Sequence, residues 1–140
     1  MAERFLLAYE GEYDQPLLLI PVPLTPSRRC ERGYNQAQYL AESLQDRLLE
    51  KGVQAELDKD VLQKHRETKL QKQASSKERL ENVEGAYHVH KRTVCKGRTI
   101  LLVDDIMTTG ATGSECAKLL LSAGAREVIF LTATALPEQK

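Results

Sequence analysis

Ile100-Leu-Leu-Val-Asp-Asp-Ile-Met-Thr-Thr-Gly-Ala-Thr-Gly113 is the stretch of sequence that decides the fold. Its four apolar residues, Ile100 to Val103, predict a buried strand, because the run is too short and too β-branched for a helix. Two adjacent acids, Asp104 and Asp105, come next, followed by a loop of Thr and Gly. A helical pattern then begins, and its apolar face holds Cys116, Ala117, Leu119, Leu120 and Ala123. The order strand, acids, small-residue loop and helix predicts a pocket for a phosphorylated sugar.

The Thr/Gly loop and the start of the helix suit a phosphate group. In open α/β sheets, ligands bind outside the carboxyl ends of the strands. A helix amino terminus there offers N–H groups and a partial positive charge. Gly110 and Gly113 would let the backbone approach the ligand or take a positive φ, and Thr108, Thr109 and Thr112 would add hydroxyl donors. A hydrogen bond to a charged group contributes about 1.5–3 kcal/mol, so four or five would hold one phosphate.

Asp104 and Asp105 would repel a phosphate, so they suit a different part of the ligand. Sugar hydroxyls or a divalent metal ion are suitable partners for their oxygen atoms. The pattern is not a P-loop, because no Gly-Lys-Ser/Thr follows the glycines. Two alternatives stay open. Asp104 caps the turn that follows it, or the acids form a phospho-acceptor site of the receiver type, although no Thr-Thr-Gly loop follows the acids in that class.

The composition is that of an ordinary globular domain. The 140 residues include 20 Lys and Arg against 20 Asp and Glu, and 41% are hydrophobic. A net charge of zero gives no general signal for nucleic acid or membranes, and the longest apolar run is far below the ~20 residues that span a bilayer. With no signal-peptide pattern, a cytoplasmic location without membrane insertion is expected. Cys30, Cys95 and Cys116 contain no Cys-x-x-Cys pair, which predicts free thiols and no zinc site.

The rest of the chain alternates strands and helices. Further strands are expected at Leu17 to Ile20, Val61 to Arg66, Ala86 to Val89 and Val128 to Ala133. A helix should begin at Asn35 and end before Gly52, with apolar residues at Ala37, Leu40, Ala41, Leu44 and Leu48. The alternation predicts an α/β fold with a mainly parallel twisted sheet flanked by helices. We expect a single domain over 1–140, with a short amino-terminal segment over 1–16.

Two basic stretches separate these elements. Pro26 to Gly33 is expected to be a basic loop that holds three arginines. Residues 67–85 show no apolar periodicity and predict a flexible loop. From Lys64 to Arg79 the chain has six Lys or Arg residues against Glu67 and Glu78. Such a loop could close over a pyrophosphate-bearing substrate and exclude water, and the alternative is a solvated surface loop.

The segment Val103 to Thr112 resembles the signature of type I phosphoribosyltransferases, which bind phosphoribosyl pyrophosphate (PRPP). The resemblance implies that Asp104 and Asp105 contact the ribose 2′ and 3′ hydroxyls. It implies a 5′-phosphate cradle made of Thr108, Thr109, Gly110, Ala111 and Thr112, and Mg²⁺ bound together with PRPP. Arg28, Arg29 and Arg32 follow the first strand, where this family has its pyrophosphate-binding loop. They are candidates for contact with pyrophosphate or a nucleic-acid phosphate, and the alternative is a surface ion pair with Glu31.

Further blocks look like the competence protein F (ComF) family, a bacterial branch of the same fold. They are Pro21-Val-Pro-Leu24, Arg32-Gly-Tyr-Asn-Gln-Ala37 and the spaced set Arg66, Thr68, Gln71, Arg79, Asn82 and Gly85-Ala-Tyr87. The resemblance spans about residues 17–135 and implies an association with natural transformation and DNA uptake. Many members begin with a four-cysteine zinc module. Here a short acidic segment, Met1 to Asp14, stands in its place.

The remaining polar residues carry weaker signals. Asn35 and Gln36 are either the cap and first turn of a helix or ligands. His88 and His90 are interpreted as plain strand residues, and Cys116 as a core residue. Candidates in the flexible loop are Arg66, Gln71 and Arg79.

Two functions remain in view. In the first, an enzyme binds PRPP, and a nitrogen nucleophile displaces pyrophosphate from ribose C1. In the second, a non-catalytic adaptor keeps the fold and handles nucleic acid. No residue is assigned a catalytic role, and no aromatic residue lies between Tyr39 and Tyr87, so a base-stacking platform is not predicted. The expected partners are PRPP or another phosphoribosyl small molecule, single-stranded DNA or the competence machinery, and a second copy of the chain in a homodimer.

Overall fold

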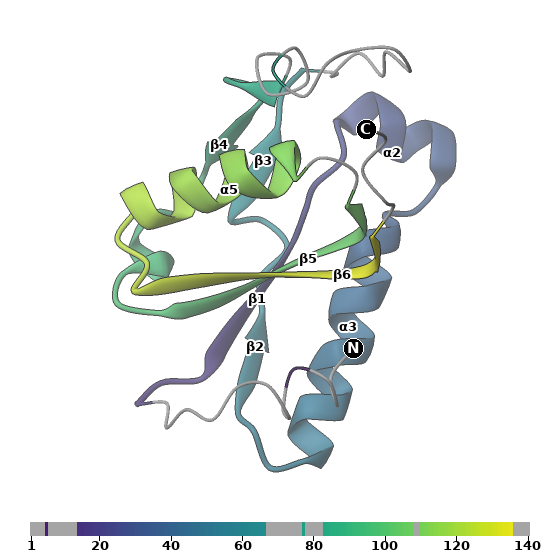
Figure 1. Ribbon diagram of the computed structural model, residues 1–140. Helices are drawn as coiled ribbons and strands as arrows, with labels where there is room; N and C mark the ends of the chain where they lie inside the picture. The colour runs from purple at the N-terminus through teal and green to yellow at the C-terminus, as the bar shows by residue number, and fades with distance from the viewer. Residues whose placement is uncertain (1–4, 6–13, 67–76, 78–82, 108–109, 136–140) are drawn as a thin grey trace.

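The computed structural model describes residues 5, 14–66, 77, 83–107 and 110–135, and its centre is a parallel β-sheet (Figure 1). Four strands form this sheet in the order β2-β1-β5-β6. Their bounds are β1 (Leu17–Pro21), β2 (Ala55–Leu57), β5 (Thr99–Met107) and β6 (Glu127–Ala135). Each neighbouring pair in the sheet is parallel. The prediction of an α/β fold with a mainly parallel sheet is confirmed.

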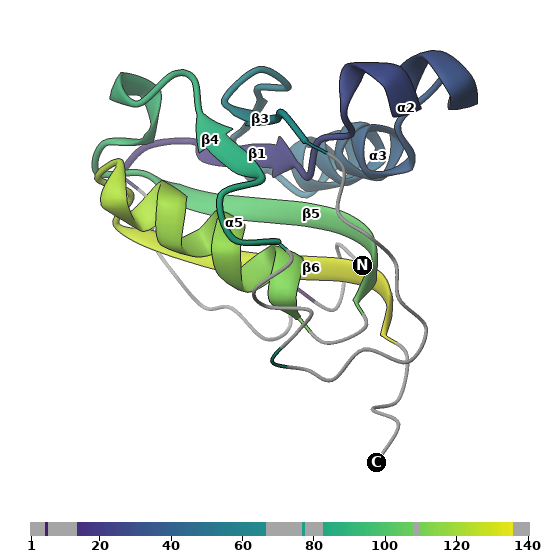
Figure 2. The same cartoon turned by 90° about the horizontal axis from the view of Figure 1, so that it is seen from above.

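Two long helices cover opposite faces of the sheet, as Figures 1 and 2 show. Helix α3 (Gln36–Glu50) packs Ala41, Leu44 and Leu48 against one face. Helix α5 (Ala111–Ser122) packs Cys116 and Leu120 against the other. Because successive side chains of a strand point to opposite faces, Leu101 and Val103 of β5 belong to the α3 side, and Ile100 and Leu102 to the α5 side. The predicted apolar stripes of both helices are therefore the buried ones.

A small antiparallel sheet lies beside α5. It pairs β3 (Leu62–Lys64) with β4 (Tyr87–Val89), and Lys64 stands opposite Tyr87. The buried side chains of Leu62 and Tyr87 join the same core cluster as α5. A short 3-10 helix, η1 (Thr93–Cys95), leads into β5. The predicted strand over Val61 to Arg66 is thus shorter than expected and lies outside the main sheet.

The basic segment after β1 is a helix, and the prediction of a loop over Pro26 to Gly33 is wrong. Helix α2 (Pro26–Arg32) begins at Thr25, whose hydroxyl accepts a hydrogen bond from the Arg28 amide at 3.3 Å. Pro26 suits the first helical position. The helix ends at Gly33, which has φ 73° and donates to the Arg29 carbonyl. No residue of α2 is buried, so the apolar periodicity that marks most helices is missing.

Two strands also differ from expectation. β2 has no predicted counterpart, because three residues carry too little periodicity to be recognised. β5 continues past Val103 through both acids to Met107. Its extension pairs with β6, where Asp104 stands opposite Thr132 and Ile106 opposite Thr134. Pairing with β6 sets the end of β5. The local sequence pattern around this end carries no information about that pairing.

The order of strands creates a switch point between β1 and β5. From β1 the chain passes through α3 to β2 on one side, and later enters β5 on the other side of β1. Ligands of open α/β sheets bind in the crevice outside the carboxyl ends of the strands at such a point. Figure 1 shows these ends of β5 and β6 below α2.

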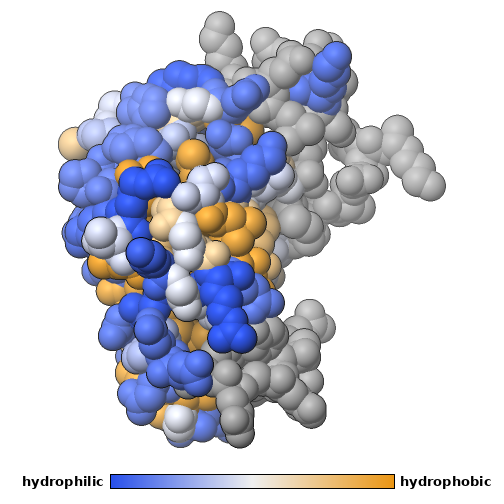
Figure 3. Space-filling model, turned by 90° about the vertical axis from the view of Figure 1, so that its left-hand side faces the viewer, coloured by the Kyte–Doolittle hydropathy of each residue, from blue (hydrophilic) through white to orange (hydrophobic). Residues whose placement is uncertain are grey.

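The surface is mostly polar on the face that Figure 3 displays. Hydrophilic residues surround a smaller hydrophobic area near the middle of this face. Within the described ranges, none of the helices has both the length and the hydropathy that crossing a membrane requires.

Candidate functional site

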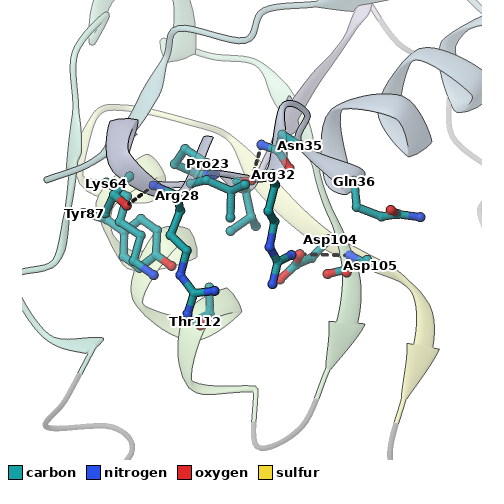
Figure 4. A pocket seen from close by; sticks show the side chains of 13 residues that line it. Pro23, Arg28, Arg32, Asn35, Gln36, Lys64, Tyr87, Asp104, Asp105 and Thr112 are labelled. Atoms are coloured by element: carbon teal, nitrogen blue, oxygen red, sulfur yellow. Dashed lines mark hydrogen bonds between the residues drawn. The ribbon is translucent and has the colours of Figure 1, made fainter. Parts of the chain in front are cut away.

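A pocket of about 190 Å³ lies at the switch point between β1 and β5. Six separate parts of the chain line it: the end of β1, α2, the start of α3, the β3–β4 hairpin, β5 and α5 (Figure 4). Its lining residues are Val22, Pro23, Leu24, Thr25, Arg28, Arg32, Asn35, Gln36, Lys64, Tyr87, Asp104, Asp105 and Thr112. The pocket therefore joins acidic, basic, hydroxyl and amide side chains that are distant in the sequence.

The acidic pair forms one wall of the pocket. The Asp105 amide donates a hydrogen bond of 2.9 Å to Oδ1 of Asp104, and the Ile106 amide donates one of 3.0 Å to Oδ1 of Asp105. Each carboxyl is thus held by the following backbone amide and keeps a second oxygen. Burial, together with the Asp105 side chain, raises the pKa of Asp104 to about 7. Near neutral pH the folded protein therefore holds a proton on Asp104 part of the time.

The start of α5 forms a second wall. Gly110 is the N-cap, with φ 77°, and as a glycine it has no side chain that could cap the first turn. Its carbonyl accepts the Ser114 amide at 2.8 Å. The side chain of Thr112 faces the pocket. A helix start offers N–H donors and a partial positive charge to an anion. Of the other predicted phosphate-loop residues, Ala111 is buried at the first position of α5, and Thr108 and Thr109 lie outside the described residues.

Gly113 has a different role from the one that the sequence predicts. It lies inside α5 and is buried, and its φ is not among the positive values. A Cβ at this position would lie 2.4 Å from Cε1 of Phe130 in β6. The missing side chain therefore allows α5 to approach the sheet closely. Gly113 serves helix packing, and of the two glycines only Gly110 takes a positive φ.

Two of the three candidate arginines line the pocket. Arg28 and Arg32 are four residues apart on α2, so they share a face of the helix. In Figure 4, Arg28 points toward Thr112 and Arg32 points toward Asp104. Arg29 projects elsewhere, is exposed and is absent from the lining. The basic side of the pocket thus comes from a helix that the sequence interpretation took for a loop.

Asn35 is the helix cap that the sequence offered as one of two roles. Its Oδ1 accepts the Ala37 amide at 3.0 Å and so caps α3. Its amide nitrogen donates to the Val22 carbonyl at 3.1 Å. The side chain thereby ties the start of α3 to the segment after β1. Asn35 also lines the pocket, as does Gln36, the first residue of α3.

Lys64 and Tyr87 are pocket residues that the sequence analysis did not single out. They face each other across the β3–β4 hairpin, and Lys64 Nζ lies 5.4 Å from the centroid of the Tyr87 ring. A signal for them would need the register of these two strands, which residues 65–86 separate in the sequence. The same hairpin sets Nδ1 of His88 3.0 Å from Nδ1 of His65. His90 lies just beyond β4 and is exposed.

Arg66 and Cys116 are absent from the pocket lining. Arg66 is exposed and donates to the Glu84 carbonyl, and Gln71 and Arg79 lie outside the described residues. Cys116 is fully buried under α5, as expected of a core residue, and burial raises the pKa of its thiol. Within the described ranges, no group of three or more His, Cys, Asp or Glu side chains could hold a metal ion.

The chain belongs to the phosphoribosyl transferase domain family, whose model matches residues 32–140. Its resemblance to the competence protein F family is also confirmed. The chain is 33% identical to competence protein F of Haemophilus influenzae over 114 residues, which are 81% of this chain and 48% of that protein. It is 37% identical to competence protein ComFC of Streptococcus pneumoniae over 78% of this chain and 44% of that protein. The DNA utilization protein YhgH of Escherichia coli K12 is 32% identical over 81% of this chain and 47% of its own length. The chain thus spans about half the length of these relatives.

Solved structures show the same fold. A hypoxanthine phosphoribosyl transferase of Trypanosoma cruzi superposes with a TM-score of 0.61 over 98% of this chain and 60% of its own, at 16% identity. A hypoxanthine phosphoribosyltransferase of Staphylococcus aureus gives a TM-score of 0.53 over 99% of this chain and 70% of its own, at 15% identity. At these identities the comparison establishes the architecture of the chain.

Proposed function

We propose that the pocket binds PRPP, or a closely related phosphoribosyl ligand, together with Mg²⁺. The observation that supports this most is the meeting of three chemically different groups in one pocket. They are the acidic pair of β5, the start of α5 and the two arginines of α2. PRPP has three matching parts, namely two ribose hydroxyls, a terminal phosphate and a pyrophosphate.

The start of α5 would take the 5′-phosphate. Gly110 is the N-cap, and Thr112 adds a hydroxyl group on the pocket side. A dianionic phosphate at this place would accept hydrogen bonds from backbone amides and would interact favourably with the helix dipole. The acids lie on the adjacent strand rather than in this turn, so they do not oppose the phosphate directly.

Asp104 and Asp105 would take the ribose hydroxyls. Each carboxyl is oriented by a backbone hydrogen bond to one of its oxygens. A carboxylate that accepts a hydrogen bond from a sugar hydroxyl holds the ring in a fixed position. This fixed position matters for any reaction at C1, since orientation of the reacting carbon is a large part of catalysis.

Arg28 and Arg32 would take the pyrophosphate. Arg guanidinium groups match phosphate oxygens in pairs of parallel hydrogen bonds, and Lys64 adds a third cationic side chain to the lining. Asp104 and Asp105 also fit Mg²⁺, which is usually held by one or two carboxylates together with substrate phosphates. When bound with PRPP, the ion would offset the charge of the pyrophosphate.

A transfer reaction is the finer part of this proposal. A nitrogen nucleophile would form a bond to ribose C1, and pyrophosphate would leave with the electron pair of the broken C1–O bond. Arg28 and Arg32 would stabilise the charge that develops on the leaving group. The second candidate is an adaptor that binds the ligand and handles nucleic acid without catalysis. The names of the relatives, which refer to competence and DNA utilization, favour it.

Calorimetric titration with PRPP, with and without Mg²⁺, tests the proposal. We expect saturable binding that Mg²⁺ strengthens and that falls at least tenfold in the double variant Asp104→Asn and Asp105→Asn. Asp46→Asn is the matched control, because Asp46 is exposed on α3 and is absent from the pocket lining. Unsaturable binding at millimolar PRPP, or equal affinity in the double variant, would overturn the proposal. Release of pyrophosphate in the presence of nucleobases separates the enzyme from the adaptor.

A further inference from the structure

The small sheet of β3 and β4 brings two histidines together that are 23 positions apart in the sequence. Nδ1 of His65 lies 3.0 Å from Nδ1 of His88, and the two ring centroids are 5.2 Å apart. The backbone fixes both positions, because Gln63 stands opposite His88 and the His65 amide donates to the Ala86 carbonyl at 3.0 Å. His65 is exposed and His88 is half-buried, so a ligand in solution can reach the pair.

Two imidazole nitrogens at this distance either share a hydrogen bond or bind one metal ion. The hydrogen bond needs opposite tautomers, with the proton on Nδ1 in one ring and on Nε2 in the other. Metal binding needs a lone pair on both Nδ1 atoms, so both protons then lie on Nε2. One proton moves from Nδ1 to Nε2 of its own ring by exchange with water, and the neutral pair releases no proton.

The distance between the two nitrogens selects the geometry of the ion. An imidazole nitrogen lies about 2.0–2.1 Å from a divalent ion. At the angle of about 90° in a tetragonal or octahedral site, two such nitrogens are about 2.9 Å apart, whereas a tetrahedral zinc ion separates them by about 3.3 Å. The observed 3.0 Å fits the first arrangement better. Nitrogen ligands in that arrangement are typical of Ni²⁺ and other late transition metals.

We propose that His65 and His88 form a binding site for a divalent late transition-metal ion such as Ni²⁺, with both Nδ1 atoms as ligands. Within the residues that the structure describes, no group of three or more His, Cys, Asp or Glu side chains could hold a metal ion. Water would therefore fill the other positions around the ion. Sequence reasoning took His88 for a plain strand residue, because its partner comes from a strand that is distant in the sequence.

The cationic neighbours of the pair have contacts of their own. Lys64 precedes His65 and points to the other face of this sheet, where its Nζ lies 5.4 Å from the centroid of the Tyr87 ring. Arg66, which follows His65, donates to the Glu84 carbonyl. Because Lys64 and Tyr87 line the pocket, an ion on the histidines would hold together the two strands that carry them. Neither histidine lines the pocket, so the inference does not depend on PRPP binding.

Calorimetric titration of the full chain with Ni²⁺ tests the inference. Ni²⁺ is a better probe than copper, because free cysteines are soft ligands that compete for copper. Loss of an outer-shell partner alone weakens metal binding about 10–100-fold, so His65→Gln and His88→Gln should each weaken Ni²⁺ binding at least about tenfold. His90→Gln is the matched control, since His90 is the third histidine of the chain and is exposed. It should bind Ni²⁺ as the wild type does.

Three further measurements define the site. Binding should be weaker at about pH 5 than at about pH 7.5, because a protonated imidazole is not a ligand. Excess Mg²⁺ should not compete, because it prefers oxygen ligands. Ni²⁺ should raise the urea midpoint of the wild type, since it binds the folded pair, and should not raise that of the double variant His65→Gln, His88→Gln.

Three outcomes would overturn the proposal. The first is the absence of saturable binding at millimolar Ni²⁺, or equal affinity in the double variant, which would leave the pair as a hydrogen bond. The second is an equal loss in His90→Gln, which would indicate binding to exposed imidazoles in general. The third is a loss in Cys30→Ser with both histidine variants unaffected, which would assign the ion to the exposed thiol of Cys30.

Discussion

Asp104 and Asp105 are consecutive residues of β5, and the amide of Asp105 donates a 2.9 Å hydrogen bond to the carboxyl of Asp104. Both side chains nevertheless line the same pocket. Burial and the neighbouring acid favour the neutral form of Asp104, whose pKa is raised from 3.8 to about 7. The proposed sugar-binding wall of the pocket therefore contains a carboxyl group, that of Asp104, whose ionisation the folded state disfavours.

Asp104→Asn is expected to change how stability depends on pH. Between about pH 4 and 7 the folded state keeps a proton on Asp104 that the unfolded state has lost, so the free energy of unfolding falls as pH rises through this window. A pKa unit corresponds to about 1.4 kcal/mol, so the fall should exceed about 1 kcal/mol. In Asp104→Asn this fall should disappear, and the variant should be more stable than the wild type at pH 8.

The measurement is urea unfolding of the ligand-free protein at intervals from pH 4.5 to 8.5. Asp46→Asn serves as the control and should follow the wild-type curve. Asp105→Asn removes one cause of the raised pKa and should move the window to lower pH. If the free energy of unfolding changes with pH in the same way for the wild type and Asp104→Asn, Asp104 ionises as freely in the folded state as in the unfolded state.

Gly113→Ala is expected to destabilise the protein by about 1–3 kcal/mol, the usual range for an overpacked core. The new Cβ would lie 2.4 Å from the Phe130 ring, so the ring or α5 must move. Phe130→Leu in the same chain should recover part of the loss, since the smaller side chain leaves room. Ser114→Ala, at an exposed position of the same helical turn, is the control. Unchanged urea midpoints in Gly113→Ala would mean that the ring turns aside without penalty.

The central strand and the helix after it could be predicted from the sequence because their signals are local. Ile100 to Val103 are all completely buried, as a continuous apolar run of this length indicates. The position of the acids relative to the strand could not be predicted in the same way. β5 continues to Met107 because β6 pairs with it, and the sequence around Asp104 contains no information about that partner.

Helix α2 shows a different limit. Its end signals were present, with Thr25 as N-cap, Pro26 at the first position and Gly33 at the end. These end signals did not lead to the prediction of a helix, because α2 buries none of its side chains and therefore has no apolar face. The contributions of Lys64 and Tyr87 depend on the register of a hairpin whose strands are distant in sequence. The sequence thus predicted the acidic pair and both arginines of the pocket lining, and tertiary structure added Lys64 and the helix that carries the arginines.

Asn35→Asp is expected to separate the two functions of Asn35. The aspartate keeps an oxygen that can cap α3, but it loses the N–H donor to the Val22 carbonyl. We expect a loss of about 1 kcal/mol or more, because the carbonyl then faces a second acceptor. Asn35→Ala loses both bonds and should be less stable than Asn35→Asp. Urea unfolding gives the order of the variants, and the reverse order would show that repulsion at Val22 outweighs the cap.

Arg98 should affect stability without affecting the pocket. Its guanidinium donates to the Pro16 carbonyl at 2.8 and 3.2 Å and to Glu56 at 2.9 Å, so it connects the starts of β1 and β5 with β2. The Arg98 side chain is 13% exposed and that of Glu56 is 58% exposed. Because an exposed ion pair contributes at most about 1 kcal/mol, Glu56→Gln should change little. Arg98→Met leaves the Pro16 carbonyl without these donors and should lower the free energy of unfolding by about 1–3 kcal/mol.

Arg98 is absent from the pocket lining at the other end of the strands, so the affinity for PRPP measured below the melting temperature should equal that of the wild type. A loss of PRPP affinity in Arg98→Met as large as that in the Asp104 and Asp105 double variant would mean that the starts of the strands also control the geometry of the pocket.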